Sequence, residues 1–528
     1  MEQLRVQLRD RGYLTHGIER WFALDPWSSR AFWIELTIVA AKAAALIALF
    51  AALPPVAIML ARNHPLTAGE TLLMTLLYGA TAFVASGIFI VVVALVMKLR
   101  PELAIDTPRT LLAISFLASA VLALPVAFWW SRFDTPPSVP ELAAGGALIV
   151  VFFVISTIVV SAALLSFSVY ELQRIPAIHQ KPRTVPMAIA AAVLLALLFI
   201  PAYAAQDKRA AEAPLQVVTT PTARRIALVA VDGLTYDIFK SRPALVSALP
   251  HAEAAKPLAG ESATERWASV GTGVPPRIHG VRAIEGLRFA GGSHVIQSLS
   301  RDDFVLHEIA PALRLGVREP LPPTVRRRDY VWEIVAARGL TSAAVNWWTT
   351  ENVRAGGLDS IGQESIFAAA QGDPVRVDEE ASKRLVTTIR RDSPRFVTVY
   401  LPALDVVLNR LPLDASARLA ASVRALDGIE TIVSALANAG YEVVIVGLPG
   451  DRQPGSAVIA STSALAPAQV FDVAPSILNA LGFPASSEMP GLSGGTRIAS
   501  YGARKTQSSS TKVDQEYYDN LKSLGYIR

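Results

Sequence analysis

The chain of 528 residues contains no cysteine. It therefore forms no disulfide, no thiolate zinc site and no cysteine nucleophile. Histidine is also scarce, and the seven histidines stand at positions 16, 64, 179, 251, 279, 294 and 307. The sequence beyond position 307 thus offers no imidazole for binding a metal.

The chain also lacks a large excess of positive or of negative side chains. The formal net charge is +5, and residues 224–528 carry 33 Lys and Arg against 31 Asp and Glu, which leaves +2 for that part. From so even a distribution we expect no nucleic-acid partner. The first 30 residues are polar and rich in arginine, and they lack the apolar core of a signal peptide.

Long apolar runs, by contrast, fill the first 205 residues. Five of them are long enough to span a hydrocarbon core of about 30 Å, and they lie at 34–60, 71–97, 110–130, 142–169 and 186–205. The pattern predicts four parts, which are a cytoplasmic segment (1–33), a transmembrane region of five helices (34–205), a polar linker (206–224) and a globular domain (225–528). The lipid bilayer is therefore the first predicted partner.

Basic residues predict the orientation of these spans. Eleven Lys and Arg residues precede the first span or lie between spans two and three or four and five, whereas the other loops hold only Arg62 and Arg132. Because cytoplasmic loops are enriched in positive charge, the amino terminus is predicted to be cytoplasmic. An odd number of spans then places the globular domain outside, at the periplasmic face of a bacterial inner membrane. Cleavage after Ala202-Tyr203-Ala204, which would release this domain, stays an alternative.

Strand-like and helix-like segments alternate from residue 225 onward. Strands are predicted at 226–231, 342–346, 395–401 and 442–447, and helices at 235–249, 329–338, 377–391, 414–439, 470–481 and 514–524. This alternation predicts an α/β fold with a mostly parallel sheet sandwiched by helices. The first strand ends at Asp232, where open α/β sheets bind ligands, so Asp232 is predicted either to hold a metal or polar substrate or to cap the next helix.

Several stretches resemble the alkaline phosphatase superfamily, and most closely its type I phosphodiesterase/nucleotide pyrophosphatase branch, which is related to the sulfatases. They are IALVAVDG at 226–233, WASVGTGVPPRIHGV at 267–281, FDVAPSILNALGFPASSEMPG at 471–491 and the terminal DNLKSLGYIR. The resemblance implies an alkaline-phosphatase-like fold over 225–528. It also implies a Thr or Ser nucleophile activated by a pair of metal ions, usually zinc, held by three aspartates and three histidines.

Only part of that ligand set has a counterpart here. Asp232 and Asp405 match two of the aspartates. The expected histidine four residues after Asp405 is Asn409, and the expected Asp-His-Gly is Leu448-Pro449-Gly450. The nucleophile position falls on Ala263, between Ser262 and Thr264, while His279 matches a histidine to which the resemblance gives a structural role.

We therefore predict a catalytically impaired family member that acts by binding a ligand or partner and needs no cofactor. In this interpretation Asp232 and Asp405 are helix caps or remnants of the fold. Candidate partners are a phosphorylated small molecule, a lipid head group or an envelope protein. The run Arg326-Arg327-Arg328 is interpreted as a solvated face, or as an attractor of anions.

Two alternatives stay open. The first is an active hydrolase of phosphoric or sulfuric esters with a rebuilt, oxygen-rich site. There Asp451 would join Asp232 and Asp405 around Zn, Mg, Mn or Ca, and Thr264 or Ser262 would be the nucleophile. The second is a transferase of phosphoethanolamine or glycerophosphate head groups.

Overall fold

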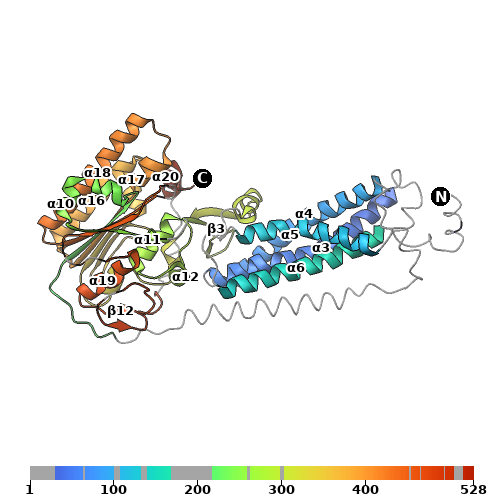
Figure 1. Ribbon diagram of the computed structural model, residues 1–528, viewed down its shortest axis with the longest axis horizontal. Coiled ribbons are helices and arrows are strands. Elements are labelled where there is room, and N and C mark those ends of the chain that lie inside the picture. Colours follow the sequence, from blue (N-terminus) through green and yellow to red (C-terminus); the bar gives the residue numbers. More distant parts are fainter. Residues whose placement is uncertain are drawn as a thin grey trace. The chain divides into compact units, whose positions relative to one another are not determined.

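A computed structural model gives the architecture of the chain (Figure 1). It describes residues 30–63, 66–99, 108–131, 139–167, 217–258, 262–297, 303–450, 453–504 apart from 464, 466 and 493, and 515–527, together with Gln7. The chain forms two compact units. One comprises residues 1–207 with 300–315, and the other comprises residues 208–299 with 316–528.

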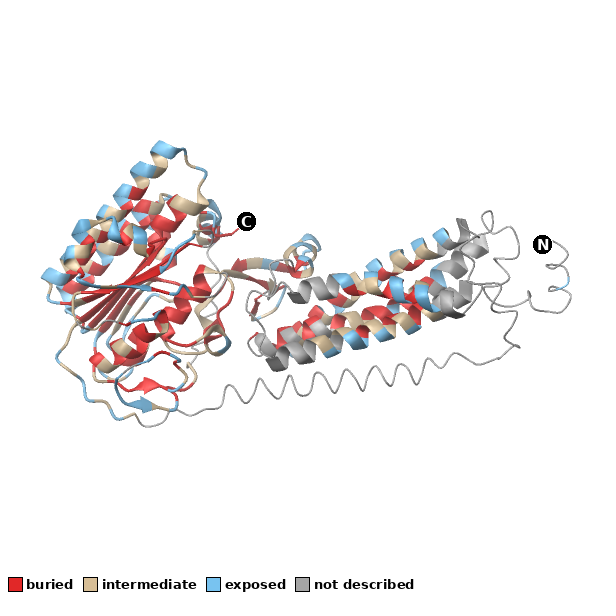
Figure 2. Cartoon of the chain, in the orientation of Figure 1, coloured by how far each residue is buried: buried red, intermediate tan, exposed pale blue. Residues whose placement is uncertain are grey.

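The first unit contains four long helices, α3 (Arg30–Arg62), α4 (Ala68–Leu99), α5 (Pro108–Ser131) and α6 (Val139–Phe167). They lie at the first four predicted spans, and the fifth, 186–205, lies outside the described residues. Within the described part, residues 40–57 and 68–93 are long and apolar enough to cross a membrane, whereas the runs in α5 and α6 are shorter. Figure 2 shows exposed residues along these helices, and large apolar side chains such as Ile88 and Leu117 are among them. This is the pattern of helices that face lipid.

A short segment from much later in the sequence belongs to the same unit. It contains the π-helical turn η3 (Val305–Ile309) and α13 (Ala310–Ala312). Leu306 and Ala310 are buried, and Asp303 accepts a hydrogen bond of 2.5 Å from the Tyr78 hydroxyl of α4. The sequence did not predict this association.

The second unit is built on an eight-stranded sheet with the order β2-β11-β10-β1-β9-β6-β8-β7. The strands are β1 (Ile226–Asp232), β2 (His251–Ala255), β6 (Ser342–Trp347), β7 (Val353–Ala355), β8 (Leu358–Gly362), β9 (Phe396–Leu401), β10 (Glu442–Leu448) and β11 (Ala457–Ser461). The five inner strands from β10 to β8 run parallel, and β11, β2 and β7 add antiparallel edges. Because β1, β6 and β9 are buried along their whole length, they appear in the sequence as continuous apolar runs.

Helices cover both faces of this sheet, which confirms the predicted α/β sandwich. In Figure 1, α10 (Pro243–Ala248), α16 (Pro374–Asp392) and α18 (Ala415–Asn438) cover one face, and α11 (Ala263–Thr272) and α19 (Val473–Ala480) cover the other. Further helical segments are α9 (Tyr236–Lys240), α12 (Pro276–His279), η4 (Pro323–Val325), α14 (Val331–Ala336), α15 (Gln363–Ala370), α17 (Ala403–Asp405), η5 (Val406–Arg410), η6 (Val470–Asp472) and α20 (Gln515–Ser523). Small sheets join β3 (Glu285–Phe289) with β4 (Val295–Ile296) and β5 (Gly316–Pro320), and β12 (Ala485–Ser486) with β13 (Arg497–Ile498).

The chain joins this unit ahead of β1. The Thr220 N–H donates to the Gly482 carbonyl at 2.9 Å, and the Thr222 N–H donates to Leu481 at 3.1 Å. Arg224 forms an ion pair with Glu442 at the start of β10. Residues 220–224 are thus held against the turn after α19 and the start of β10.

An aromatic cluster fills the core beside the carboxyl ends of β6 and β9. Tyr330 stacks on Trp332 with ring centroids 4.2 Å apart, and Trp332 lies 4.8 Å from Trp347. Trp267 and Tyr400 complete the cluster, at 5.3 Å from each other. Such pairs add about 0.5–1.5 kcal/mol each beyond the area they bury, so the cluster stabilises this end of the sheet.

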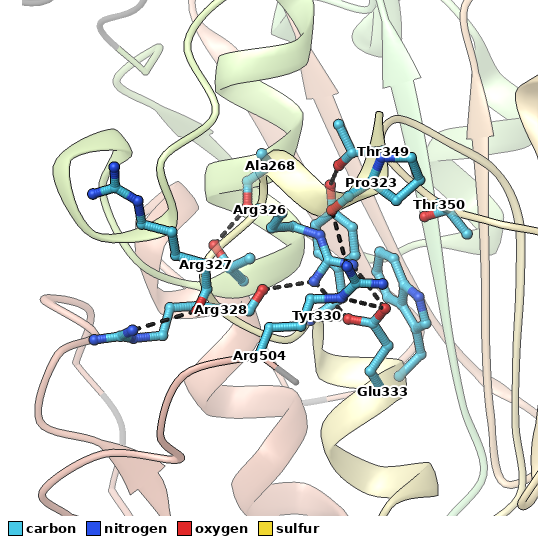
Figure 3. A network of polar contacts seen from close by, with 12 residues as sticks. Ala268, Pro323, Arg326, Arg327, Arg328, Tyr330, Glu333, Thr349, Thr350 and Arg504 are labelled. Atoms are coloured by element: carbon cyan, nitrogen blue, oxygen red, sulfur yellow. Dashed lines mark hydrogen bonds and ion pairs between the residues drawn. The ribbon is translucent and has the colours of Figure 1, made fainter. Parts of the chain in front are cut away.

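The run Arg326-Arg327-Arg328 lies next to this cluster, and its first arginine is buried, whereas the sequence predicted a solvated face (Figure 3). Arg326 is buried, forms two hydrogen bonds of 2.6 and 2.7 Å to Glu333, and lies 3.7 Å from the Tyr330 ring centroid. Arg328 pairs in the same way with Glu488. The interpretation as a solvated face is wrong for Arg326, because a carboxylate from α14 compensates its charge inside the protein.

One buried carboxyl predicts a pH dependence of stability. Asp378 of α16 is 5% exposed and accepts a hydrogen bond from the Ala403 N–H, and burial raises the pKa of its side chain well above its usual value. Because the pKa of Asp378 in the folded state lies above its value of about 3.9 in the unfolded chain, the protonated side chain favours the folded state. This contribution to stability is fully present below the unfolded pKa and is lost as the pH rises through the folded pKa. Between the two pKa values the loss is about 1.4 kcal/mol per pH unit.

Asp378→Asn should remove this slope. Thermal unfolding of the full chain in detergent at pH 4, 6 and 8 measures it, with the exposed Asp427→Asn in α18 as the control. A slope that is unchanged in Asp378→Asn would contradict a raised pKa at this residue.

Candidate functional site

Asp232 lies at the carboxyl end of β1, as the sequence predicted, and is fully buried. Its Oδ2 accepts a hydrogen bond of 3.1 Å from the Tyr400 hydroxyl, and its Oδ1 lies 3.9 Å from a guanidinium nitrogen of Arg266 in α11. Thr235, rather than Asp232, caps α9 through a hydrogen bond from the Ile238 N–H. The predicted helix-cap role of Asp232 is therefore wrong, since its carboxylate faces a tyrosine and an arginine.

Asp405 follows the neighbouring strand β9 and is also fully buried. Its Oδ1 accepts from the Asn409 amide at 2.8 Å and its Oδ2 from Arg410 Nε at 2.6 Å. The wide π-helical turn η5 brings residues four and five positions along the chain to the same carboxylate. The side chain of Asp405 caps no helix, so that prediction is wrong here as well.

The carboxy-terminal residues lie against this pair. The guanidinium carbon of Arg410 is 4.3 Å from the Tyr526 ring centroid, and Tyr526 packs edge-on against Trp348 at 5.3 Å. Burial raises the pKa of Tyr526, the Arg410 guanidinium opposes this rise, and the charges of Asp232 and Asp405 add to it. Tyr526 therefore packs on the guanidinium that pairs with Asp405.

Sequence reasoning missed Arg266, Tyr400 and Arg410, which contact the two carboxylates, and Tyr526, which packs on Arg410. One signal was present, because Arg410 directly follows Asn409, the residue that replaces a family histidine. The other three come from segments that only the folded sheet brings together.

The predicted nucleophile region forms the first turn of α11. Ser262 is its N-cap, accepting from the Glu265 N–H at 3.0 Å and donating to the Arg282 carbonyl at 2.8 Å. Thr264 is 1% exposed, and its hydroxyl has no hydrogen-bond partner among the residues that the structure describes. Since Arg266 two residues later reaches Asp232, this turn lies beside the carboxylate. The Ser262 hydroxyl is therefore occupied by capping, whereas the Thr264 hydroxyl has no such bond.

His279 has a different environment from a catalytic histidine. Its Nδ1 accepts from the Val281 N–H at 3.1 Å, so the ring proton resides on Nε2, which lies 3.0 Å from the Ser269 hydroxyl. Ser269 in turn donates to the Glu265 carbonyl. Burial lowers the pKa of His279 well below its usual value, and nearby arginines add to this effect. The neutral ring thus accepts from one backbone amide and supports Ser269, as a structural residue does.

The residues present do not fit a dinuclear zinc centre. Such an ion needs about four ligands, and within the described ranges no three His, Cys, Asp or Glu side chains gather closely enough to hold a metal. Both oxygens of Asp405 already accept hydrogen bonds, and a Cβ added at Gly450 would collide with its Oδ1. The end of β10, where the family carries further ligands, thus packs directly onto the carboxylate. Asp451 lies outside the described residues.

A surface groove of 540 Å³ lies at the amino ends of the parallel strands, away from the carboxyl ends that carry Asp232 and Asp405. It is lined by residues around the starts of β6 and β8, including Arg354, Asp359, Arg391 and Asp392. Arg391 pairs with both aspartates, and Arg354 lies 3.7 Å from Asp392. These charges compensate one another, so the groove has no excess charge to attract an ionic ligand.

A family model described as type I phosphodiesterase / nucleotide pyrophosphatase matches residues 227–447, which is less than half of the chain. Over its α/β domain the chain is thus similar to the alkaline phosphatase superfamily. The family generally depends on divalent metal ions. A search of curated proteins found no match.

Solved structures that are similar to this chain include a mouse protein and proteins of bacteria. Murine ectonucleotide pyrophosphatase/phosphodiesterase 5 is 11% identical with a TM-score of 0.30, and the match covers 42% of this chain and 56% of that one. Phosphonoacetate hydrolase from Sinorhizobium meliloti 1021 is 13% identical with a TM-score of 0.29, covering 46% and 60%. A sulfatase candidate from Bacteroides thetaiotaomicron VPI-5482 is 9% identical with a TM-score of 0.34, covering 52% and 74%. The chain thus spans less than two thirds of the length of the first two.

Proposed function

We propose that this chain is a membrane-anchored, extracytoplasmic member of its family that binds a ligand or protein partner without metal-dependent hydrolysis. One observation carries the proposal. Each of the two carboxylates that match the family's metal ligands lies beside an arginine, Asp232 beside Arg266 and Asp405 beside Arg410. A guanidinium supplies the positive charge that a divalent ion would otherwise supply to a buried carboxylate.

The energetics of burial support this interpretation. A buried carboxylate is costly unless it is paired and hydrogen-bonded, and Asp405 meets both conditions through Arg410 and Asn409. A metal ion could bind Asp405 only by displacing these bonds and placing its own charge next to the Arg410 guanidinium. An arginine cannot be deprotonated in a protein, so this repulsion persists at every working pH.

Membrane anchoring is supported by the two apolar stretches of membrane length in α3 and α4. Basic residues are in excess before the first span and in the loops between spans two and three and between spans four and five. This excess favours a cytoplasmic amino terminus and a domain at the outer face of a bacterial inner membrane. A phosphorylated small molecule, a lipid head group or an envelope protein is the proposed ligand.

Metal content and turnover of the purified full chain test the proposal. The protein in detergent would be incubated with Zn²⁺, Mn²⁺, Mg²⁺ or Ca²⁺, desalted, and analysed for bound metal. It would then be assayed with bis-p-nitrophenyl phosphate and p-nitrophenyl sulfate. We expect less than one metal ion per chain and no turnover above that of Asp232→Asn.

Opposite results would distinguish the alternatives. Stoichiometric metal together with turnover that is lost in Asp232→Asn and Thr264→Ala would establish a hydrolase. Stoichiometric metal with modified lipids or glycans in membranes, but without hydrolysis, would establish a head-group transferase.

A further inference from the structure

We infer that residues 303–315 lie at the outer interface of the membrane, with the side chains of Phe304 and Leu313 among the lipids. This inference rests on the membrane anchoring proposed above and adds to it a second, non-spanning membrane contact. The segment stands between β4 and β5 in the sequence, yet it belongs to the unit formed by the long apolar helices.

A specific contact holds the segment on a helix of membrane length. The Tyr78 hydroxyl of α4 donates to Asp303 Oδ2 at 2.5 Å, and Asp303 Oδ1 accepts from the Leu306 N–H at 3.2 Å. Tyr78 and Asp303 are 7% and 1% exposed. Both carboxylate oxygens are therefore satisfied, as they must be for a carboxylate that approaches hydrocarbon.

The position of Tyr78 along α4 indicates the depth of the contact. The apolar stretch 68–93 has 26 residues, which at about 1.5 Å per residue is about 39 Å long. This exceeds a hydrocarbon core of about 30 Å by about 9 Å. Tyr78 follows the first residue of the stretch by ten positions, or about 15 Å. The acidic Glu70 in the first turn of α4 indicates that the excess lies at that end, which places Tyr78 about 6 Å inside the core boundary, close to the head groups.

The surface of the segment matches such a position. Leu306 and Ala310 are buried in the unit, whereas Phe304 and Leu313 are 62% and 61% exposed. The charged side chains of Glu308 and Arg314 are exposed on the same segment. Large apolar groups mixed with charges are typical of elements that lie in the interface plane, with apolar groups in the acyl boundary and charges among the head groups.

Because the chain has no cysteine, single-cysteine variants carry one label each. Phe304→Cys and Leu313→Cys of the full chain would be nitroxide-labelled in vesicles of phosphatidylethanolamine and phosphatidylglycerol. Power saturation would compare their collisions with oxygen, which partitions into lipid, and with a water-soluble nickel chelate. Ile88→Cys in α4 is the lipid reference, and Leu419→Cys in α18 is the water reference, since these side chains are 61% and 66% exposed.

We expect the oxygen-to-nickel collision ratios of Phe304→Cys and Leu313→Cys to approach that of Ile88→Cys and to exceed that of Leu419→Cys. Adding Tyr78→Phe, which removes the bond to Asp303, should shift the Phe304→Cys ratio toward the water reference. Ratios equal to that of Leu419→Cys would overturn the inference and leave the anchoring intact. Poor access of both reagents would overturn it in favour of a protein partner. A water-like ratio at Ile88→Cys would overturn the anchoring as well.

Discussion

Arg410→Gln is expected to lower the free energy of unfolding by about 3–5 kcal/mol, which is the usual cost of leaving a buried charge without its partner. The guanidinium donates to Asp405 at 2.6 Å, and the side chains of Arg410 and Asp405 are 10% and 0% exposed. The substitution also removes the packing of Arg410 on the Tyr526 ring. Denaturant unfolding of the full chain in detergent, followed by the fluorescence of the buried tryptophans, measures the loss.

Two variants make this measurement specific. Arg384→Gln breaks an exposed ion pair with Glu380 one helical turn away, and it should cost only about 0.3–0.5 kcal/mol. Asp405→Asn combined with Arg410→Gln removes both charges and should cost less than Arg410→Gln alone. A loss below about 1 kcal/mol for Arg410→Gln would show that water or another cation compensates Asp405, which would contradict the proposed role of Arg410.

Glu333→Gln is expected to have an effect of similar size, again about 3–5 kcal/mol. The Arg326 side chain that it pairs with is 0% exposed and has two hydrogen bonds to Glu333 (Figure 3). Glu333 also accepts from the Tyr330 N–H at 2.7 Å. Its loss would leave Arg326 charged and without its carboxylate next to the aromatic cluster.

The pH dependence gives this prediction a second measurement. Burial opposes ionisation of Glu333, but the charge and hydrogen bonds of Arg326 prevail and lower its pKa. A lowered pKa gives stability that is present above the unfolded value and is lost as the pH falls through the folded value. Glu333→Gln should therefore flatten the acid limb of the stability curve. Glu379→Gln, whose pair with Arg424 is more than half exposed on both sides, should change stability by about 0–1 kcal/mol. An equal effect of the two variants would contradict the prediction.

Short-range sequence patterns were sufficient to predict four of the eight strands of the main sheet. The strands at 226, 342, 396 and 442 stand out because inner parallel strands are buried on both faces and so form continuous apolar runs. The inner strand β8 and the edge strands β2, β7 and β11 were missed. β2 has mostly exposed residues and β7 has only three, so neither forms a clear apolar run. The four helices of the first unit were predicted for the same reason as the inner strands, since each is a long apolar run.

The sequence by itself determined the α/β domain, the apolar amino-terminal helices, and the retention of Asp232 and Asp405 without the family's histidines. It could do so because apolar runs and motifs are formed by residues that are close together in the sequence. Only the tertiary structure decided what lies beside the two aspartates, and it placed Arg266 and Arg410 there. It also decided that residues 303–315 pack on α4. The physical reason is that a charge pair depends on distance in space. Arg266 reaches Asp232 only when α11 packs against β1, and Arg410 reaches Asp405 only because η5 makes a π-helical turn.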